Sequence, residues 1–291
     1  MFPGMPTTTL QLSSGPVRVH DDGTGPVLVF LHGLLVDGRL WRKVTPLLTD
    51  RARCVVPDLP LGSHPAAMKP DADLTPPGVA RLVGELLEEL DLRDVTLVGN
   101  DTGGAIAQLV VTRHPERVAR LVLTPCDAFE HFPPAMFRPL QWIARVPPAV
   151  ALMAASMRFD ALRRSPMAYG WLAKSRIPGE ILDAWMRPAR EDRGVARDLI
   201  KVLRGIHPRY TLEAAEHLPE FDGPTLLAWA PEDRFFKRAW ADRLAERLRD
   251  ARVVDIPDSY TFVPEDQPAR LADLIAEFAK LDAASRPIQV A

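Results

Sequence analysis

The amino-acid sequence predicts an α/β fold, a doubly wound and mostly parallel sheet with an inserted helical segment. Three observations predict this class. Short apolar runs alternate with segments of helical periodicity from about residue 27 to residue 123, as in sheets whose strands are joined by helices. The alternation stops over residues 127–219, where prolines are frequent and no strand is clear. It resumes at residue 225 and continues to residue 281.

The first half of the chain contains most of the predicted strands. Residues 7–12 and 17–20 are predicted strands, and Ser13-Ser14-Gly15-Pro16 between them is typical of a hairpin turn. Residues 27–31 form a continuous apolar run, typical of a strand buried on both faces of a parallel sheet. After it we expect a helix at 41–48, a strand at 53–56, a helix at 76–90, a strand at 95–98, a helix at 105–114 and a strand at 118–123.

The segment after Asp127 is predicted to be a helical cap inserted into the sheet domain. Its helical patches carry methionine, tryptophan and phenylalanine. We therefore divide the chain into a core of residues 1–129 and 219–291 and a cap of residues 130–218. The core then resumes with a strand at 225–229, a helix at 239–248, a strand at 252–256 and a helix at 267–281, and residues 283–291 are expected to be frayed.

Asp101 lies at the centre of the most informative motif. Gly99-x-Asp101-x-Gly103 joins an apolar strand to a helix, which is the frame of a nucleophile elbow with aspartate at its apex. Glycines let the neighbouring backbones approach closely, and the apex side chain then stands above the sheet beside the positive end of a helix. Ligands of doubly wound sheets bind at this edge. The motif alone also allows a plain glycine-rich turn with a solvated carboxylate.

Composition and charge exclude several kinds of partner. The 291 residues have a formal net charge of −2, which gives no indication of a nucleic-acid or membrane partner. No apolar stretch is long enough to span a bilayer, and Met1-Phe2-Pro3-Gly4 does not begin a signal peptide. Cys54 and Cys126 are expected to be buried thiols in a reducing compartment. We expect a cytoplasmic monomer or homodimer with a small-molecule substrate and no metal or cofactor.

Several motifs of the chain occur in a characteristic order. They are a strand that ends in His32-Gly33, the elbow, a helical insertion after the next strand, Trp229-Ala230-Pro231-Glu232-Asp233, and Asp266-Gln267-Pro268. Together they resemble the α/β-hydrolase fold from about residue 7 to residue 280. The aspartate at the elbow makes the chain similar to the epoxide hydrolase and dehalogenase branch of that fold.

The resemblance implies a two-step reaction. Asp101 would attack a carbon atom to form an alkyl-enzyme ester, and the backbone N–H groups of Leu34 and Thr102 would form the oxyanion hole. An acid would then orient a histidine that activates water. Asp233 matches the family's acid, and Asp127, just after the strand that follows the elbow, is a second candidate.

The histidine that the family places after the last strand is missing. This chain has Thr261 at that position and no histidine after His217. Threonine does not titrate near neutral pH, so it cannot take a proton from water. His64, on a loop at the carboxyl edge of the sheet, is the first candidate for a replacement base, and His207 is the second. The resemblance implies that His32 shapes the oxyanion loop.

Three functions remain open. The first is a hydrolase-fold enzyme that acts on a hydrophobic small molecule, with Asp101 as nucleophile or as acid and base in an incomplete triad. The second is a lyase, isomerase or cyclase in which Asp101 is a general acid or base and no water step is needed. The third is a small-molecule binding protein or receptor without catalysis. The presence of both Asp101 and Asp233 favours an enzyme.

Epoxide hydrolysis fits the motifs better than dehalogenation. The family's dehalogenases hold the halide with a tryptophan directly after the nucleophile, and many add an asparagine after the His-Gly pair, where this chain has Thr102 and Leu34. Tyr169 is a candidate donor to an oxirane oxygen. The aromatic and methionine side chains of the cap predict an apolar pocket. The residues expected to contact the substrate are His32, Tyr169, Trp171, Tyr260 and Thr261.

Overall fold

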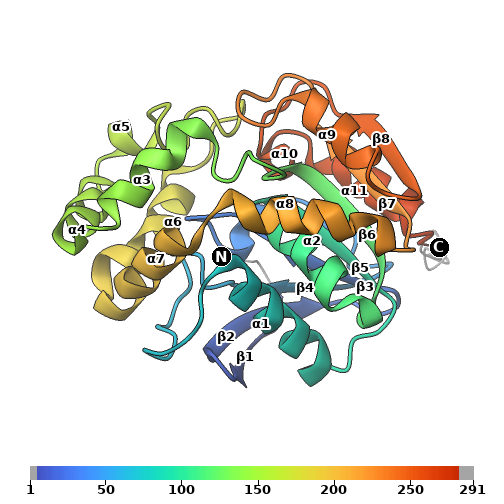
Figure 1. Ribbon diagram of the computed structural model, residues 1–291, viewed down its shortest axis with the longest axis horizontal. Helices are drawn as coiled ribbons and strands as arrows, with labels where there is room; N and C mark the ends of the chain where they lie inside the picture. The colour runs from blue at the N-terminus through green and yellow to red at the C-terminus, as the bar shows by residue number, and fades with distance from the viewer. Residues whose placement is uncertain (1–4, 282–291) are drawn as a thin grey trace, which may run out of the picture.

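The computed structural model describes residues 5–281, so the predictions for the first four residues and for the frayed end at 283–291 lie outside that range. Within it, one eight-stranded sheet carries helices on both faces, and a group of helices lies at one end of the molecule (Figure 1). The predicted α/β class with a mostly parallel sheet is confirmed.

The strands follow the order β1-β2-β4-β3-β5-β6-β7-β8 across the sheet. β2 pairs antiparallel with both β1 and β4, and the remaining pairs are parallel. β3 and β7 have their predicted bounds, because both are continuous apolar runs buried between two layers of helices. The bounds are β1 (Thr7–Leu12), β2 (Gly15–Asp22), β3 (Val27–Leu31), β4 (Arg53–Pro57), β5 (Val95–Asp101), β6 (Val118–Cys126), β7 (Thr225–Trp229) and β8 (Ala251–Asp255).

Alternate residues of the strands point into two separate cores. One core joins the sheet to α1, α2, α8 and α9, and the other joins it to η1 and α11. The bounds of the helices and 3₁₀ turns are η1 (Gly38–Trp41), η2 (Thr45–Leu47), α1 (Pro76–Glu89), α2 (Thr102–Arg113), η3 (Pro115–Arg117), η4 (Ala135–Phe137), α3 (Arg138–Ile143), α4 (Pro147–Ser156), α5 (Asp160–Arg163), α6 (Gly179–Glu191), α7 (Arg193–Gly205), α8 (Pro208–His217), η5 (Leu218–Glu220), α9 (Arg238–Ala245), α10 (Val263–Asp266) and α11 (Pro268–Phe278).

The helix predicted over residues 41–48 is wrong. Two 3₁₀ turns, η1 and η2, occupy this region, and their hydrogen bonds join residues three apart, as from Leu47 N to Val44 O. Pro46 lacks the N–H that a continuous α-helix would use at that position. The other predicted helices of the core are present, with ends that differ by up to three residues.

The chain between β6 and β7 forms helices and 3₁₀ turns without a named strand, in the part that the structure describes. α4 packs on α6 and α7, whereas α8 packs on α2 of the core. Several buried hydrogen bonds join the cap to the core, and two of them involve α6 and α7. Trp185 Nε1 of α6 donates to Asp37 Oδ1 at 3.1 Å, and Met68 N donates to Asp198 Oδ2 of α7 at 2.7 Å. The division at residues 130 and 218 stays a prediction.

Candidate active site

Asp101 ends β5 and directly precedes α2, with a backbone φ of 54°. This left-handed conformation is strained for a residue with a side chain. The surrounding glycines make the turn sterically feasible. A β-carbon at Gly103 would lie 2.4 Å from the Leu31 carbonyl oxygen, and one at Gly33 would lie 2.1 Å from Asp101 Oδ2. The strand-to-helix turn predicted from the glycines is therefore present.

The Asp101 carboxyl accepts backbone hydrogen bonds at the place where the resemblance puts the oxyanion hole. Leu34 N donates to Asp101 Oδ2 at 3.2 Å, and the N–H of Thr102 is a second donor to the carboxyl. Burial raises the pKa of Asp101 to about 7, although the two N–H groups oppose this shift. The charge of Asp101 therefore changes near neutral pH.

Asp127 is the second carboxyl of the site. It is buried just beyond β6, where Thr102 Oγ1 donates to its Oδ2 at 3.1 Å, while its Oδ1 has no hydrogen-bond partner among the described residues. Burial and the nearby Asp101 carboxylate raise the pKa of Asp127 well above the ordinary value of an aspartate. Two neighbouring buried carboxyls do not readily ionise together, and the two N–H donors at Asp101 favour the carboxylate form there, so the pair is suited to offer one acid and one carboxylate.

Asp233 lies on the loop after β7, near Thr261. Phe235 N and Phe236 N each donate to Asp233 Oδ1 at 2.7 Å. Burial raises the pKa of Asp233 to about 6, although these N–H groups oppose this shift. Neither Asp233 Oδ2 nor Thr261 Oγ1 completes a hydrogen bond with a described residue. A carboxyl that could orient a base is thus present, but the side chain beside it is a hydroxyl that does not titrate near neutral pH.

Asn100 fixes the main chain of the Thr261 loop against the elbow. Its Nδ2 donates to the carbonyl oxygen of Thr261 and to Thr124 Oγ1, both at 2.7 Å, and the side chain is fully buried. Asn100 is not among the residues predicted from the sequence, although a polar side chain directly before the elbow apex, at the end of an apolar strand, is a signal of such a role. The loop after β8 therefore reaches the elbow through a side chain of β5.

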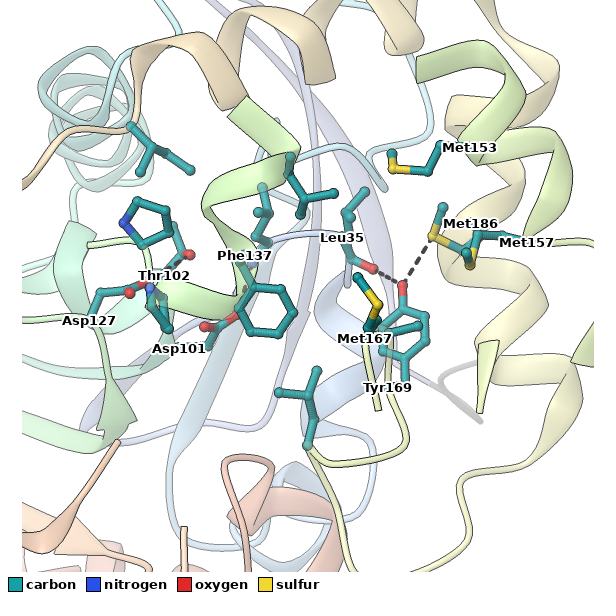
Figure 2. A pocket seen from close by; sticks show the side chains of 17 residues that line it. Leu35, Asp101, Thr102, Asp127, Phe137, Met153, Met157, Met167, Tyr169 and Met186 are labelled. Carbon is teal, nitrogen blue, oxygen red and sulfur yellow. Dashed lines mark hydrogen bonds between the residues drawn. The ribbon is translucent and has the colours of Figure 1, made fainter. Parts of the chain in front are cut away.

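Asp101, Thr102 and Asp127 form the polar end of a pocket of about 750 Å³, a volume that includes its opening to solvent. Figure 2 shows these three side chains on one side, with Tyr169 and the sulfur atoms of several methionines on the other. Such a pocket suits an apolar small molecule with one reactive polar group. The remaining lining residues are Leu34, Leu35, Pro133, Pro134, Phe137, Leu140, Met153, Met157, Met167, Ala168, Leu172, Met186 and Ile206.

Tyr169 is the one residue among the five expected substrate contacts that lines this pocket. Its hydroxyl donates to the carbonyl oxygen of Leu35 at 2.5 Å and lies 3.1 Å from Met186 Sδ (Figure 2). Burial raises the pKa of Tyr169 above its ordinary value. Because its single proton is already engaged by Leu35, the hydroxyl is not a free donor for a substrate oxygen.

His32 is bonded within the loop at the end of β3 and does not line the pocket. Its Nε2 accepts a hydrogen bond from Leu59 N at 2.8 Å, and its Nδ1 lies 2.9 Å from the carbonyl oxygen of Gly33. Burial lowers the pKa of His32 to about 4. A neutral His32 therefore holds the loop that carries Leu34, which is the role that the resemblance implies.

His64 is also engaged outside the pocket. It is buried, and its Nε2 lies 3.4 Å from Asp198 Oδ2 of α7. It is not among the residues that line the pocket. His207, the second candidate base, caps α8 by accepting a hydrogen bond from Arg209 N, and it too lies outside the lining. The structure therefore does not bring either histidine into the site with Asp101.

Trp171 and Tyr260 lie outside the pocket, and both rings contact the side chain of Arg234. The guanidinium of Arg234 stacks on both rings, 4.8 Å from the centre of Trp171 and 5.0 Å from that of Tyr260. The pocket wall includes instead side chains such as Leu140 and Met186, which the sequence does not mark. A methionine-rich helical patch has the same pattern whether it lines a cavity or fills a core.

Further observations concern metal binding, membrane-spanning helices and the two cysteines. Within residues 5–281, no group of three or more His, Cys, Asp or Glu side chains is arranged to hold a metal ion. No helix in that range is both long and apolar enough to cross a membrane. Cys54 and Cys126 are buried free thiols, as predicted. The cytoplasmic location and the monomeric or dimeric state stay predictions.

Curated relatives extend over nearly the whole chain. Haloalkane dehalogenase 2 of Mycobacterium bovis is 28% identical, over 91% of this chain and 92% of that protein. The cis-3-alkyl-4-alkyloxetan-2-one decarboxylase of Xanthomonas campestris pv. campestris is 28% identical, over 95% of this chain and 97% of that protein.

Solved structures show the same fold. Epoxide hydrolase CorEH without ligand has a TM-score of 0.79 at 20% identity, over 94% of this chain and 98% of that one. An α/β-hydrolase-fold protein from Burkholderia ambifaria also has a TM-score of 0.79 at 20% identity, over 94% of this chain and 100% of that one. The sequence model of the alpha/beta hydrolase family matches residues 28–274, and the chain belongs to this family of enzymes.

Proposed function

We propose that this enzyme opens a strained, oxygen-containing ring in a hydrophobic small molecule, with Asp101 as the nucleophile. One observation carries the proposal. The Asp101 carboxyl stands at the polar end of an apolar pocket and accepts the N–H groups of Leu34 and Thr102. Donors placed in this way stabilise the carboxylate and then the ester that it forms, and they leave an oxygen to attack carbon.

Asp127 supplies the proton in this proposal. When Asp101 attacks a carbon of an epoxide, the ring C–O bond breaks and the ring oxygen leaves as an alkoxide that needs a proton. Asp127 lines the same pocket, and its raised pKa keeps it protonated near neutral pH. The Tyr169 hydroxyl, the donor expected from the resemblance, is instead bonded to Leu35.

The second step is where the proposed enzyme departs from its family. The ester on Asp101 needs an activated water for hydrolysis, and Thr261 stands beside Asp233 where the family has histidine. A general base contributes about 10²–10⁴-fold to such a step. We therefore expect the ester to form readily and to hydrolyse slowly.

Dehalogenation fits this pocket less well. A leaving halide needs N–H donors from side chains, which the resemblance places directly after the nucleophile and after the His-Gly pair. Here those positions are Thr102 and Leu34, whose backbone N–H groups are directed at the Asp101 carboxyl. Neither tryptophan nor asparagine is among the described residues that line the pocket.

The proposal is tested by intact-protein mass spectrometry with a small apolar epoxide such as styrene oxide. We expect the protein to gain the mass of one epoxide. The Asp101→Ala protein should remain folded and should not gain the mass of the epoxide. Asp94→Ala is the matched control, because Asp94 also has a positive φ, of 53°, but is exposed and outside the pocket. An adduct on the Asp101→Ala protein, or none on the wild type, would overturn the proposal.

A second candidate is a lyase that acts on a β-lactone, favoured by the absence of a base and by the similarity to an oxetanone decarboxylase. Attack by Asp101 on the ring carbon that bears the ring oxygen would break that C–O bond and free a carboxylate on the neighbouring carbon. Loss of CO₂ would then leave an electron pair that forms the alkene and expels the Asp101 carboxylate. Neither water nor histidine takes part, so Thr261 would not slow this reaction.

Product analysis separates the candidates. Repeated turnover of a dialkyl β-lactone to alkene and CO₂, without a lasting adduct, would support the lyase. A lasting epoxide adduct would support the incomplete hydrolase. Saturable thermal stabilisation by either compound, with neither product nor adduct, would indicate the third function expected from the sequence, a binding protein.

A further inference from the structure

The outer part of the cap carries most of the large apolar side chains that are exposed to solvent. Among residues 5–281, nine such side chains are exposed, and seven of them lie between residues 136 and 167. Leu47 and Leu212 are the two elsewhere. Trp142, Leu152 and Met167 are 71%, 72% and 70% exposed. We call the seven the cap patch: Met136, Trp142, Val146, Leu152, Phe159, Leu162 and Met167.

The helices of the cap patch already bury another side. α4 packs on α6 and α7 and buries Val150 and Ala154, yet Leu152 on the same helix is exposed. α4 contains no charged residue at all. Figure 1 places α3 and α4 at the outer end of the cap, away from the sheet. An apolar outer face is unfavourable in water and is typical of a surface that meets an apolar partner.

The chain around the cap patch is mainly positively charged: residues 136–167 contain five arginines and one aspartate, Asp160, which pairs with Arg163 and Arg164. Residues 131–159 contain no aspartate or glutamate and three arginines, which gives a formal charge of +3 in a chain whose net charge is −2. All three arginines are exposed. The ion pairs in this part of the cap involve Arg163 and Arg164, in the described residues, and none of the three. The three are Arg138, Arg145 and Arg158.

We propose that the cap patch binds the surface of an anionic lipid bilayer. Tryptophan, phenylalanine and leucine side chains on one side of short helices bury themselves at the boundary between headgroups and acyl chains. Arginine stems lie along that apolar layer while their guanidinium groups reach lipid phosphates. The expectation of no membrane partner rested on the net charge of the whole chain, whereas the attraction depends on where the charge lies.

A second copy of the chain is a less suitable partner. A two-fold interface brings the same surface of both copies together, so Arg138, Arg145 and Arg158 of each copy would face those of the other. Like charges placed opposite one another without carboxylates between them oppose association. An anionic surface removes that repulsion and pairs with the same arginines.

The pocket reaches the cap patch at Met167. Met167 belongs to the patch and also lines the pocket, and Met153 and Met157 line it from the same part of the cap. A bound apolar molecule would therefore have a short path between the bilayer and Asp101. The proposed binding surface thus fits an enzyme whose substrate partitions into membranes.

Sedimentation with vesicles tests this inference on the full chain. We expect binding to phosphatidylcholine vesicles that contain one third phosphatidylglycerol, weaker binding at high salt, and little binding to phosphatidylcholine alone. Leu152→Glu should lower the affinity for the anionic vesicles on the order of tenfold, because it removes a leucine side chain that would be buried in the bilayer. Arg158→Gln should lower it about fivefold.

The matched controls are the same two kinds of substitution, leucine to glutamate and arginine to glutamine, at exposed positions outside the cap. Leu47→Glu and Arg247→Gln replace an exposed leucine and an exposed arginine and should bind as the wild type does. Asp101→Ala should also bind normally, which keeps this inference separate from the proposed reaction. Equal binding by Leu152→Glu and Leu47→Glu, or no binding to the anionic vesicles at low salt, would overturn the inference. A lipid-free dimer that Leu152→Glu dissociates would assign the patch to a second copy instead.

Discussion

Two carboxyls in one pocket, Asp101 and Asp127, have different hydrogen-bonding surroundings. Burial raises the pKa of both Asp101 and Asp127, but backbone N–H groups partly stabilise the charged form of Asp101. The Asp101 carboxylate in turn raises the pKa of Asp127. The two N–H donors favour the charged form at Asp101, and the Asp101 carboxylate favours the protonated form at Asp127, which supports the proposed roles of nucleophile and acid.

The rate of adduct formation should depend on pH as a bell-shaped curve. The rise should have its midpoint near pH 7, because Asp101 must be ionised and its pKa is about 7. The fall at higher pH should come from loss of the Asp127 proton. The rate of adduct formation at each pH is measured by mass spectrometry of samples quenched at successive times. A rate that decreases from acidic to neutral pH would show that Asp101 acts as an acid.

Asp127→Asn tests the assignment of the acid. Asparagine keeps the size of the side chain and a carbonyl oxygen for Thr102, but it has no acidic proton. We expect the rate to fall about 10²-fold and the decline at high pH to disappear. An unchanged rate would remove Asp127 from the mechanism and leave the alkoxide to be protonated by water.

Thr261→His should restore hydrolysis of the ester. The new imidazole would lie beside Asp233, whose Oδ2 has no partner among the described residues, and would supply the missing base. Release of the adduct should accelerate by about 10²-fold or more. Tyr260→His is the control, since Tyr260 interacts with Arg234 outside the pocket and should leave release slow. Equal release rates in the two variants would contradict this role of position 261.

At the residue scale, the elbow and its two N–H groups are predictable because they lie next to glycines with a fixed spacing. The hydrogen-bond partner of Asn100 and the choice of the methionines that line the pocket are not, since both depend on segments far away in the chain. Asn100 reaches Thr261 across 161 positions. Spacing along a strand or helix does not specify such contacts.

At the scale of elements, the cap is attached to the core through a few buried polar side chains. Asp198 of α7 accepts a hydrogen bond from Met68 N and lies beside His64, and its other oxygen pairs with Arg197. Trp185 of α6 bonds Asp37. These contacts fix the helices that form part of the pocket wall, so the position of the cap depends on them.

Asp198→Ala should lower the free energy of unfolding by about 2 kcal/mol. The substitution leaves the buried Met68 N–H and His64 without their acceptor. Denaturation by urea, followed by circular dichroism, measures the change. Asp192→Ala removes only the N-cap of the same helix, at an exposed site, and should cost about 1 kcal/mol. A smaller effect for Asp198→Ala than for Asp192→Ala would show that the buried contact adds nothing.

The elements of the core are largely predictable, and those of the cap are not. Buried parallel strands have a distinct apolar run, so β3 and β7 are predicted to the residue. The 3₁₀ turns η1 and η2 depend on Pro46 and on the cap of η1 by Asp37, which interrupt an otherwise helical pattern. The short cap helices have apolar residues on more than one face, and periodicity therefore does not locate their ends.

At the scale of the whole molecule, buried acids make stability depend on pH. Burial raises the pKa of Asp37 and Asp101 to about 7, and that of Asp233 to about 6. An unfolded aspartate has a pKa of about 3.9, so between about pH 4 and pH 7 the folded chain holds more protons. The free energy of unfolding therefore falls as pH rises through this range, by up to about 1.4 kcal/mol per pH unit for each group.

Urea unfolding at about pH 5 and about pH 8 should show the greater stability at the acidic value. Asp37→Asn removes one of the buried charges while keeping an acceptor for Trp185, so it should reduce the difference between the two pH values. Asp71→Asn, at an exposed position, should leave it unchanged. Below about pH 4 the trend reverses, because Asp58 and Asp198, whose pKa values their partners lower despite burial, lose their charge.

The hydrogen bond from Asn100 to the Thr261 carbonyl has a consequence for substitutions at position 261. It holds the main chain of the loop through the Thr261 carbonyl oxygen, so this anchor does not depend on which side chain position 261 carries. A change of residue there keeps the anchor, although the side chain is buried and its neighbours must accommodate the new size. Under the proposed function, one substitution at this position would switch the enzyme between a reaction that needs an activated water and one that does not.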